Sequence, residues 1–504
     1  CYSLINTGAL EAWKVFFQAT VDGSSFILRS GTPTAGVAPS AGATAPDGST
    51  VFWIPDITKV YGVKVVLNIN YYNVQVFTAS INTTLPSMTL STTVGGQTFT
   101  YLNMSTINGV RVVDARVTVV KTKIVVKDSQ PTPQPLRGAA VVIAAQVGDP
   151  IYSATGEGGA VFLPPYTTTA VAETTAGPFG RVYASVYGDY GYLPVPFTYI
   201  YRPDLLQTFT IRVYWIFPGG EKWVDVTPDG NTFSLNITDF IVKGCAIAQF
   251  TFFAKVYEVK VRAVDLCGNP ITPTGYPGAY FVAYLDGERI GAIGLGADGT
   301  MDVGLLPAGK LKLRLYWKGV FLRANVTLPA EPEIEVTKNV GRAVTLEFPV
   351  GNLNVTVTMW DINYPLYKIQ VKLQYLKDGK VVYEEPAKLT DCYGRVTFTQ
   401  VPVRPLTTDE GAGRTYAIRV LAYTTDKTPY IRSQDAGLLV ANDTIPFEKL
   451  QVACWNTYTL PAWIYSFNVI AVDHAGAVLK GLATSAGTYP VAVLLNDTTY
   501  GLQP

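Results

Sequence analysis

The stretch from Val256 to Tyr316 constrains the fold of this chain more than any other. Between Val256 and Val264 apolar side chains alternate with Glu258, Lys260 and Arg262. Successive side chains of a β-strand point to opposite faces, so this period of two predicts a strand with one buried and one solvated face.

Turn signals divide the rest of this stretch into short strands. Asp286-Gly287 follows an apolar run at 278–285, and Asp298-Gly299 follows the next run. Asp-Gly between strand-like runs is a strong hairpin signal. Residues 310–316 alternate leucine with lysine or arginine. Together these features predict an antiparallel meander, with Val259 and Leu313 in its core.

The same order of strands and turns recurs along the chain. Ala471–Gly476 repeats Ala263–Gly268 with four identities in six. Comparable patterns begin near residues 45, 123 and 355. Repeats of about 100 residues match the usual size of an immunoglobulin-like sandwich. We therefore predict an all-β chain of tandem antiparallel β-sandwiches, divided at 1–118, 119–250, 251–349, 350–460 and 461–504, the last incomplete.

Length and charge limit the possible functions. The 504 residues are too many for one core, and 48% hydrophobic content supplies several. Lys and Arg number 39 against 38 Asp and Glu, which gives no reason to expect a nucleic-acid partner. No apolar run is long enough to cross a bilayer, so any membrane anchor would lie outside this sequence. The chain starts with Cys1, so we expect a processed chain or a fragment.

The spacing of these turns resembles a known family. Asp265 to Pro270, Asp286-Gly287, Asp298-Gly299 and Pro307-Ala308-Gly309 follow successive strands. This order resembles the carboxypeptidase-regulatory-like, or transthyretin-like, β-sandwich repeat, and is similar to bacterial pilin B-type domains. The resemblance implies a fold, and implies surface proteins such as archaeal S-layer subunits. Its motif is mainly turn chemistry, so it specifies function poorly. One His and four Met suggest a thermophile.

Five cysteines indicate the compartment. Cys245 and Cys454 each lie about ten residues before a repeat. We predict disulfides Cys245–Cys267 and Cys392–Cys454 in an extracellular protein. Cys1 is left to bridge two subunits or carry a lipid. The alternative is that all five are free thiols in a reducing cytosol.

Glycosylation sequons agree with a surface location. The pattern Asn-x-Ser/Thr marks possible N-linked glycans on exposed turns of secreted chains. Asn354 lies inside a predicted strand, so we expect it to be the least accessible. The pattern occurs at Asn82, Asn103, Asn236, Asn325, Asn354, Asn442 and Asn496.

Residues for catalysis are scarce, and we expect no enzyme. His474 is the only histidine, and it lies in a turn where the matching repeat has Leu266. Glu384 and Glu385 are adjacent in a strand and point to opposite faces, so they cannot flank one bond. We expect no cofactor or metal site. Tyrosine-rich stretches could form a sugar-binding or subunit-contact surface, or could fill the cores; they are Tyr71-Tyr72, 187–192, 199–201 and Tyr214-Trp215.

Three classes of function remain open. The first is an extracellular structural protein, a subunit of an S-layer or surface filament that polymerises head to tail. The second is an adhesin or glycan-binding protein, and the third is an accessory region of a larger secreted enzyme. We favour the first. Because residues 461–504 cannot complete a sandwich, we expect the N-terminal strand of one subunit, near Ala12–Val21, to complete the next.

Overall fold

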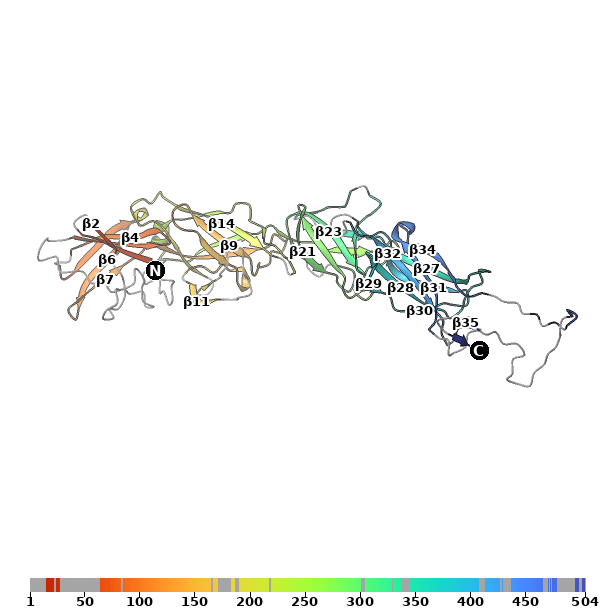
Figure 1. Ribbon diagram of the computed structural model, residues 1–504. Coiled ribbons are helices and arrows are strands. Elements are labelled where there is room, and N and C mark those ends of the chain that lie inside the picture. The colour runs from red at the N-terminus through yellow and green to blue at the C-terminus, as the bar shows by residue number, and fades with distance from the viewer. Residues whose placement is uncertain are drawn as a thin grey trace. The chain divides into compact units, whose positions relative to one another are not determined.

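A computed structural model describes most of the chain. It covers residues 15–21, 24–27, 64–82, 85–164, 166–170, 183–185, 190–216, 219–300, 304–328, 330–337, 344–407, 413–426, 428, 437–465, 470, 472, 474–477, 495–497 and 501–503. Nearly all regular structure in this part is β-strand, as the sequence predicts (Figure 1). Contacts divide the chain into two compact units. The first unit is Cys1–Val350 with Pro402–Gly413 and Val452–Cys454, and the second is Gly351–Val401, Arg414–Gln451 and Trp455–Pro504.

The first sandwich, in the first unit, has two sheets. One has the order β2-β1-β3-β4 and the other β5-β6-β7. The strands are β1 Val15–Val21, β2 Ser24–Ile27, β3 Lys64–Tyr71, β4 Val74–Asn82, β5 Met88–Val94, β6 Gln97–Ile107 and β7 Val110–Ala115. Phe77 of β4 meets Tyr101 of β6 edge-on, so the sheets share one core. Tyr72 and Asn73 have φ of 51° and 55°, which suits a tight turn between β3 and β4.

The second sandwich pairs a five-stranded sheet with the sheet β13-β8-β17, and β11 and β12 form a separate hairpin. The strands are β8 Val119–Lys127, β9 Ala140–Ala145, β10 Ile151–Ala154, β11 Tyr166–Ala170, β12 Tyr183–Ser185, β13 Gly191–Pro194, β14 Gln207–Trp215, β15 Val224–Asp225, β16 Thr232–Leu235 and β17 Ala248–Phe253. Short helices interrupt them at η2 Glu157–Gly159, η3 Phe197–Tyr201 and α2 Ile237–Val242. Asn236 caps α2 by accepting from the backbone N–H groups of Thr238 and Asp239.

The third sandwich contains the predicted meander and confirms its hairpins. Asp286 and Gly287, with φ of 49° and 86°, join β20 to β21. The strands are β18 Val256–Glu258, β19 Val261–Val264, β20 Tyr280–Leu285, β21 Glu288–Gly294, β22 Leu305–Pro307, β23 Gly309–Trp317, β24 Val320–Arg323, β25 Ile334–Val336 and β26 Val344–Glu347. Val259 and Leu313 are each 1% exposed, as predicted for the core. Arg314, which the alternation places opposite the leucines of this strand, is buried too and forms an ion pair with Glu331 at 3.0 Å.

The fourth sandwich makes up most of the second unit. Its sheets have the orders β31-β27-β34 and β29-β28-β32-β33, with β30 beside β28. The strands are β27 Val350–Met359, β28 Gln370–Lys377, β29 Lys380–Glu384, β30 Lys388–Leu389, β31 Arg395–Pro402, β32 Tyr416–Tyr423, β33 Leu439–Pro446 and β34 Trp455–Ala462, with η6 at Phe447–Lys449. Beyond it, β35 Leu495–Asp497 and β36 Gly501–Gln503 form a hairpin.

In the second, third and fourth sandwiches the last strand pairs in parallel with an early strand, which is the first strand in the second and fourth sandwiches and the second strand in the third. The pairs are β17 with β8, β26 with β19 and β34 with β27. The other strand pairs of these sandwiches are antiparallel, as predicted. A parallel pair needs a crossover connection, and here the intervening strands supply it. β17 and β34 also extend past the boundaries expected at 250 and 460. The division into five domains stays a prediction.

No helix in the described part of the chain is long and apolar enough to cross a membrane.

Candidate functional site

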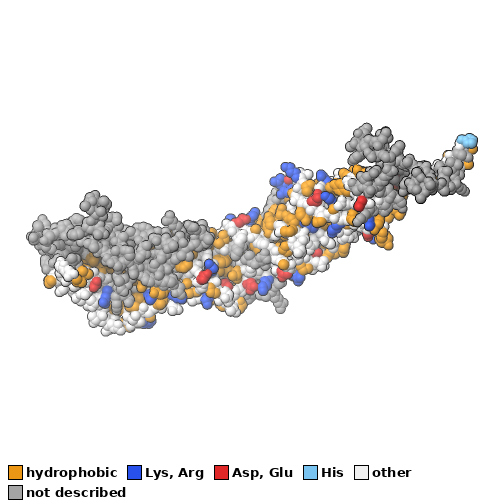
Figure 2. Space-filling view, turned by 90° about the horizontal axis from the view of Figure 1, so that it is seen from below, with side chains coloured by type: hydrophobic (Ala, Val, Ile, Leu, Met, Phe, Trp, Pro, Cys, Tyr) orange, Lys and Arg blue, Asp and Glu red, His pale blue; other side chains and the backbone are white. Residues whose placement is uncertain are grey.

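The residues considered for catalysis lie apart from one another. His474 is exposed in a turn, and Figure 2 shows the histidine at the surface. Glu384 is exposed, whereas Glu385 is buried and accepts a 2.9 Å hydrogen bond from the Tyr375 hydroxyl. Burial, followed by the charge of Glu385, raises the pKa of Tyr375 well above its ordinary value. Among the described residues, no group of three or more His, Cys, Asp or Glu could hold a metal ion.

A short backbone arrangement recurs where the last strand of one sandwich leads into the first strand of the next. We call it a joint, and it is formed by three consecutive residues. At Ala254-Lys255-Val256, the N–H of Val256 donates to Ala254 O at 2.7 Å, which closes a three-residue turn. The Lys255 N–H donates to Val226 O at 2.9 Å, and Lys255 O accepts from the N–H of Ala308 at 2.9 Å. The middle residue, Lys255, is thus hydrogen-bonded to the sandwich before the joint through its N–H and to the sandwich after it through its carbonyl.

The joint at Val117-Thr118-Val119 repeats this arrangement. The Val119 N–H donates to Val117 O at 3.1 Å. The Thr118 N–H donates to Val76 O at 2.9 Å, and Thr118 O accepts from Val195 at 3.0 Å.

The joint at Phe348-Pro349-Val350 lies within the first unit. The Val350 N–H donates to Phe348 O at 2.7 Å, and Pro349 O accepts from Val403 at 2.9 Å. Proline has no N–H, so this joint lacks only the donation from its middle residue.

A buried aspartate orders the turn beside two of these joints. Asp128 Oδ1 accepts from the N–H of Gln134 at 2.9 Å, and Asp265 Oδ1 accepts from the N–H of Asn269 at 2.8 Å. The residue after each aspartate binds the last residue of a joint. After Asp128, the Ser129 N–H donates to Val256 O at 3.1 Å. Leu266 N–H donates to Val350 O at 2.8 Å in the same way. The Asp turns that the sequence showed as repeats therefore hold the joints.

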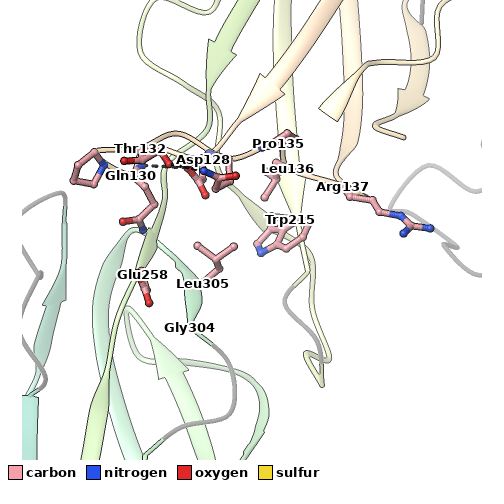
Figure 3. Close-up of a pocket in the computed structure, with 12 residues that line it drawn as sticks. Asp128, Gln130, Thr132, Pro135, Leu136, Arg137, Trp215, Glu258, Gly304 and Leu305 are labelled. Carbon is pink, nitrogen blue, oxygen red and sulfur yellow. Dashed lines mark hydrogen bonds between the residues drawn. The ribbon is translucent and has the colours of Figure 1, made fainter. Parts of the chain in front are cut away.

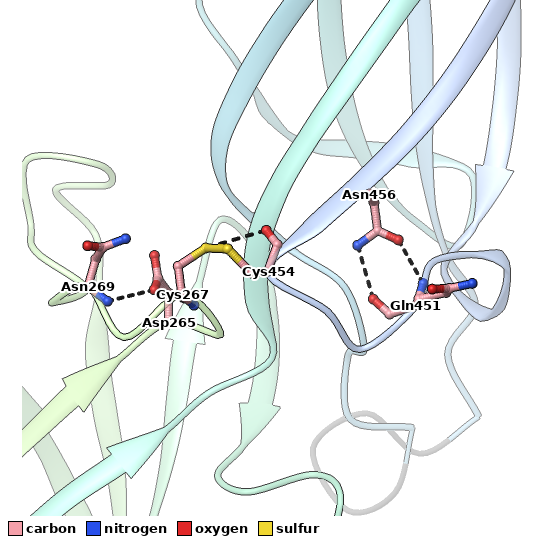
Figure 4. Close-up of a disulfide and its surroundings, with 6 residues drawn as sticks. All are labelled: Asp265, Cys267, Asn269, Gln451, Cys454 and Asn456. Carbon is pink, nitrogen blue, oxygen red and sulfur yellow. Dashed lines mark hydrogen bonds between the residues drawn. A yellow bond between two sulfur atoms is a disulfide. The ribbon is translucent and has the colours of Figure 1, made fainter.

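A disulfide connects Cys267, in the Asp265 turn, to Cys454 (Figure 4). Their Cα atoms are 4.8 Å apart. The predicted pairs Cys245–Cys267 and Cys392–Cys454 are therefore wrong. The place of a cysteine in the repeat does not determine its partner, because pairing depends on which turns meet in space.

The other cysteines differ in state. Cys392 is an exposed free thiol. Cys245 is itself disulfide-bonded. Its partner lies outside the described residues, as does Cys1.

Asn456 closes the loop that carries Cys454. Its Oδ1 accepts from the Gln451 N–H at 2.8 Å, and its Nδ2 donates to Gln451 O at 3.0 Å (Figure 4). These two bonds fix the approach of the chain to β34.

A groove of about 820 Å³ lies within the first unit, below the Asp128 turn (Figure 3). Leu136 and Leu305 supply apolar surface, and Glu258 supplies a carboxylate. Gln130 Nε2 and Trp215 Nε1 are buried donor atoms, and neither has a hydrogen-bond partner among the residues that the structure describes. Buried donors without partners are costly to a folded protein. The sequence marks Tyr214-Trp215 as part of a tyrosine-rich stretch. That Trp215 and Gln130 line the same groove follows only from the fold.

The tyrosine-rich stretches divide between core and surface. Tyr71 and Tyr72 are 0% and 4% exposed and fill the first sandwich. Tyr201 is 50% exposed. Partial burial and a hydrogen bond with Tyr101 raise the pKa of Tyr201 to about 12. Tyr187 lies outside the described residues.

The sequon asparagines are not equally accessible. Asn103 and Asn442 are exposed. Asn236 Nδ2 donates to Pro203 O at 3.1 Å, and Asn354 Oδ1 accepts from Thr397 at 2.6 Å. Asn82 and Asn325 are half-buried, and the exposure of Asn496 is not described.

No protein-family model and no curated protein matches this chain. Among solved structures it is similar to the Bacillus anthracis TIE protein, with 13% identity, coverage of 90% of this chain and 69% of that one, and a TM-score of 0.18. It is also similar to BcpA, the major pilin subunit of Bacillus cereus, at 8% identity and a TM-score of 0.17. A streptococcal ancillary pilin has 10% identity and a TM-score of 0.21. Both pilin matches cover 68% of this chain and 99% of the pilin. At these TM-scores the likeness carries no argument about function.

Proposed function

We propose that this chain is an extracellular structural protein, a subunit of a self-assembling filament or layer at the cell surface. The observation that carries the proposal is the joint, which recurs at three sandwich boundaries with the same three-residue turn and the same donation to its middle carbonyl. A linker that is hydrogen-bonded on both sides resists bending better than a flexible one. Such a construction suits a protein whose task is mechanical.

The covalent and surface features support the same location. The Cys267–Cys454 bond fits an oxidising compartment outside the cytosol. Asn103 and Asn442 are exposed and are the first candidates for N-linked glycans. Archaeal and thermophilic origin, an S-layer rather than a filament, and a membrane anchor beyond this sequence stay predictions.

The strand-exchange hypothesis needs revision. β1 pairs with β2 on one side and with β3 on the other, within its own chain. A strand paired on both edges would have to leave its sheet before another subunit could receive it. We therefore propose head-to-tail self-association without donation of Val15–Val21.

Sedimentation velocity over a range of concentrations tests this function. The proposal predicts that the sedimentation coefficient of the purified chain grows with concentration. A coefficient that stays at the monomer value throughout would reject self-assembly.

The groove supports a second candidate function, which is glycan binding by a surface adhesin. Sugars present many hydroxyl acceptors, and Gln130 and Trp215, which line the groove, both carry side-chain donors. Indole rings also offer apolar faces for sugar rings. An accessory role in a larger secreted enzyme has no comparable observation in its favour.

A further inference from the structure

An arm of the second sandwich lies along one edge of the third sandwich. The arm comprises residues 219–222, between β14 and β15. The N–H of Glu221 donates to Ile290 O at 2.7 Å, and the N–H of Ala292 donates to Gly219 O at 3.3 Å. Among the described strands, β21 otherwise pairs only with β20, which would leave its outer edge open to another strand. The arm covers part of that edge as a short additional strand.

Glycines on both sides allow the two backbones to meet. Gly220 and Gly291 form an antiparallel bridge. A Cβ at Gly291 would lie 2.7 Å from Gly220 Cα, and a Cβ at Gly219 would lie 2.7 Å from Ala292 O. Only glycine permits backbones to approach this closely. The sequence is therefore suited to this contact in the arm and in β21.

Two ion pairs connect the arm to β21. The Arg289 guanidinium lies 2.8 Å from the Glu221 carboxylate, and the Lys222 ammonium lies 3.4 Å from the Glu288 carboxylate. These four side chains are between 47% and 75% exposed. Ion pairs exposed to this extent are each weak, and dissolved salt screens them. The side-chain contacts of the arm should therefore weaken as the salt concentration rises.

The boundary between the first and second sandwiches is held differently. Phe197 of η3, in the second sandwich, is 1% exposed. Its ring centroid lies 5.4 Å from that of Phe77 and 5.4 Å from that of Tyr101, both in the first sandwich. Buried aromatic contacts of this kind depend on exclusion from water rather than on charge, so screening by salt does not weaken them. This boundary should stay closed at salt concentrations that weaken the arm.

We propose that the arm is a salt-sensitive latch between the second and third sandwiches. When the latch is closed, the arm and the joint at Ala254-Lys255-Val256 hold the third sandwich at two different strands, so the two sandwiches move as one body. When it is open, the third sandwich turns about the joint, and the edge of β21 can pair with another strand. The proposal goes beyond the structural function, because it states where one subunit bends, and it does not depend on self-assembly.

Distances between spin labels test the latch. In a Cys392→Ser background, labels at the exposed positions Thr232→Cys and Glu335→Cys report on the second and third sandwiches. The distance distribution should be narrow at low salt and should broaden at about 1 M NaCl, where the Debye length is about 3 Å. The control pair, Thr93→Cys with Thr232→Cys, spans the first and second sandwiches and should stay narrow. A distribution that salt leaves unchanged across the latch, or equal broadening in the control, overturns the proposal.

Charge reversal separates the latch from general effects of salt. Glu221→Lys places a cation beside Arg289, so it should broaden the distribution already at low salt. Adding Arg289→Glu restores an opposite pair and should make the distribution narrow again. Arg202→Glu is the control, because Arg202 pairs with Asp204 inside the second sandwich. If the double variant is as broad as Glu221→Lys alone, this ion pair does not hold the latch.

A pair of glycines provides a steric test. Gly219 and Gly230 have φ of 82° and 68°, so replacement by alanine strains the backbone in both cases. A Cβ at Gly230 has no atom within 4 Å, whereas a Cβ at Gly219 meets Ala292 O. Gly219→Ala should therefore broaden the distribution at low salt and Gly230→Ala should not. The same distribution in both variants would contradict the role of the arm.

Hydrogen exchange of the unmodified protein decides the question if the variants fold poorly. The amides of Glu221 and Ala292 should exchange at least about tenfold faster in 1 M NaCl than at low salt, because their acceptors lie across the latch. The amide of Val161 donates to Ile124 O inside the second sandwich and should not change. Exchange at Glu221 and Ala292 that is as insensitive to salt as exchange at Val161 would reject the latch.

Discussion

The backbone N–H of Ala308 donates to the carbonyl oxygen of Lys255 at 2.9 Å. Through this bond the strand Leu305–Pro307 holds the residue that precedes the first strand of its own sandwich. Val195 and Thr118 form the same contact at 3.0 Å in the preceding joint. The joints therefore share a backbone donation to their middle carbonyl, which any donor residue except proline can supply.

Replacing Ala308 by proline should weaken the third sandwich. The change removes the N–H and leaves Lys255 O without its donor, at a cost of about 1–3 kcal/mol in the free energy of unfolding. Ala308→Val is the matched control, because valine occupies this position in two other joints and keeps the N–H. Urea denaturation measures both variants, and equal stabilities would show that the bond contributes nothing.

Loss of the Cys267–Cys454 bond should be strongly destabilising. The bond closes a loop with a sequence separation of 187 residues. The chain-entropy estimate for so long a loop is about 5 kcal/mol. Thermal melts of Cys267→Ser and of the control Cys392→Ser should differ, with only the first melting earlier. A Cys267→Ser variant with the melting temperature of the unmodified protein would contradict the assignment.

Peptide mapping without reductant should recover Cys245 linked to Cys1. Cys267 and Cys454 are paired and Cys392 is free, so Cys1 is the one cysteine of the sequence left for Cys245. This prediction competes with the roles in subunit bridging or lipid attachment expected from the sequence. A lipid-modified Cys1, or a Cys245 peptide with a free thiol, would exclude the link.

The Tyr375–Glu385 pair predicts a loss of stability at alkaline pH. The pKa of Tyr375 is raised in the folded protein, so the folded state keeps its proton where the unfolded state releases it. The stability this contributes is complete below about pH 10 and falls as pH rises toward the folded pKa. Tyr375→Phe should lower stability by about 1–3 kcal/mol at pH 7, because Glu385 loses a donor.

The pH profile separates this effect from packing. Above pH 10 the Tyr375→Phe variant should lose less stability than the unmodified protein, whereas the control Tyr393→Phe should not differ from it, since Tyr393 is 66% exposed. Unchanged alkaline sensitivity in Tyr375→Phe would contradict the assignment. Denaturant melts between pH 7 and 11 measure all three proteins.

The sequence predicted local structure well and long-range pairing badly. The Asp286-Gly287 hairpin and the burial of Leu313 follow from turn chemistry and a period of two, which depend on neighbouring residues only. Burial of Arg314 depends on Glu331, which lies in a separate segment 17 residues away. The partners of Cys267 and of the donors in the joints likewise depend on which turns meet after folding, and no local pattern records that.

Glycan binding by the groove can be measured directly. Titration with chitopentaose and with mannopentaose should change the tryptophan fluorescence of the chain, and Trp215→Ala and Gln130→Leu should each weaken binding at least 10-fold, the equivalent of about 1.4 kcal/mol. Trp360→Ala is the control, because Trp360 is exposed in the second unit. If neither sugar binds, or if the control loses as much affinity, these sugars do not occupy the groove.

Negative-stain electron microscopy of the purified chain, concentrated under non-reducing conditions, tests the central claim most directly. A self-assembling surface protein should form threads or sheets with a regular repeat, which dissolve on dilution. Dispersed single particles at every concentration would contradict the proposed structural function.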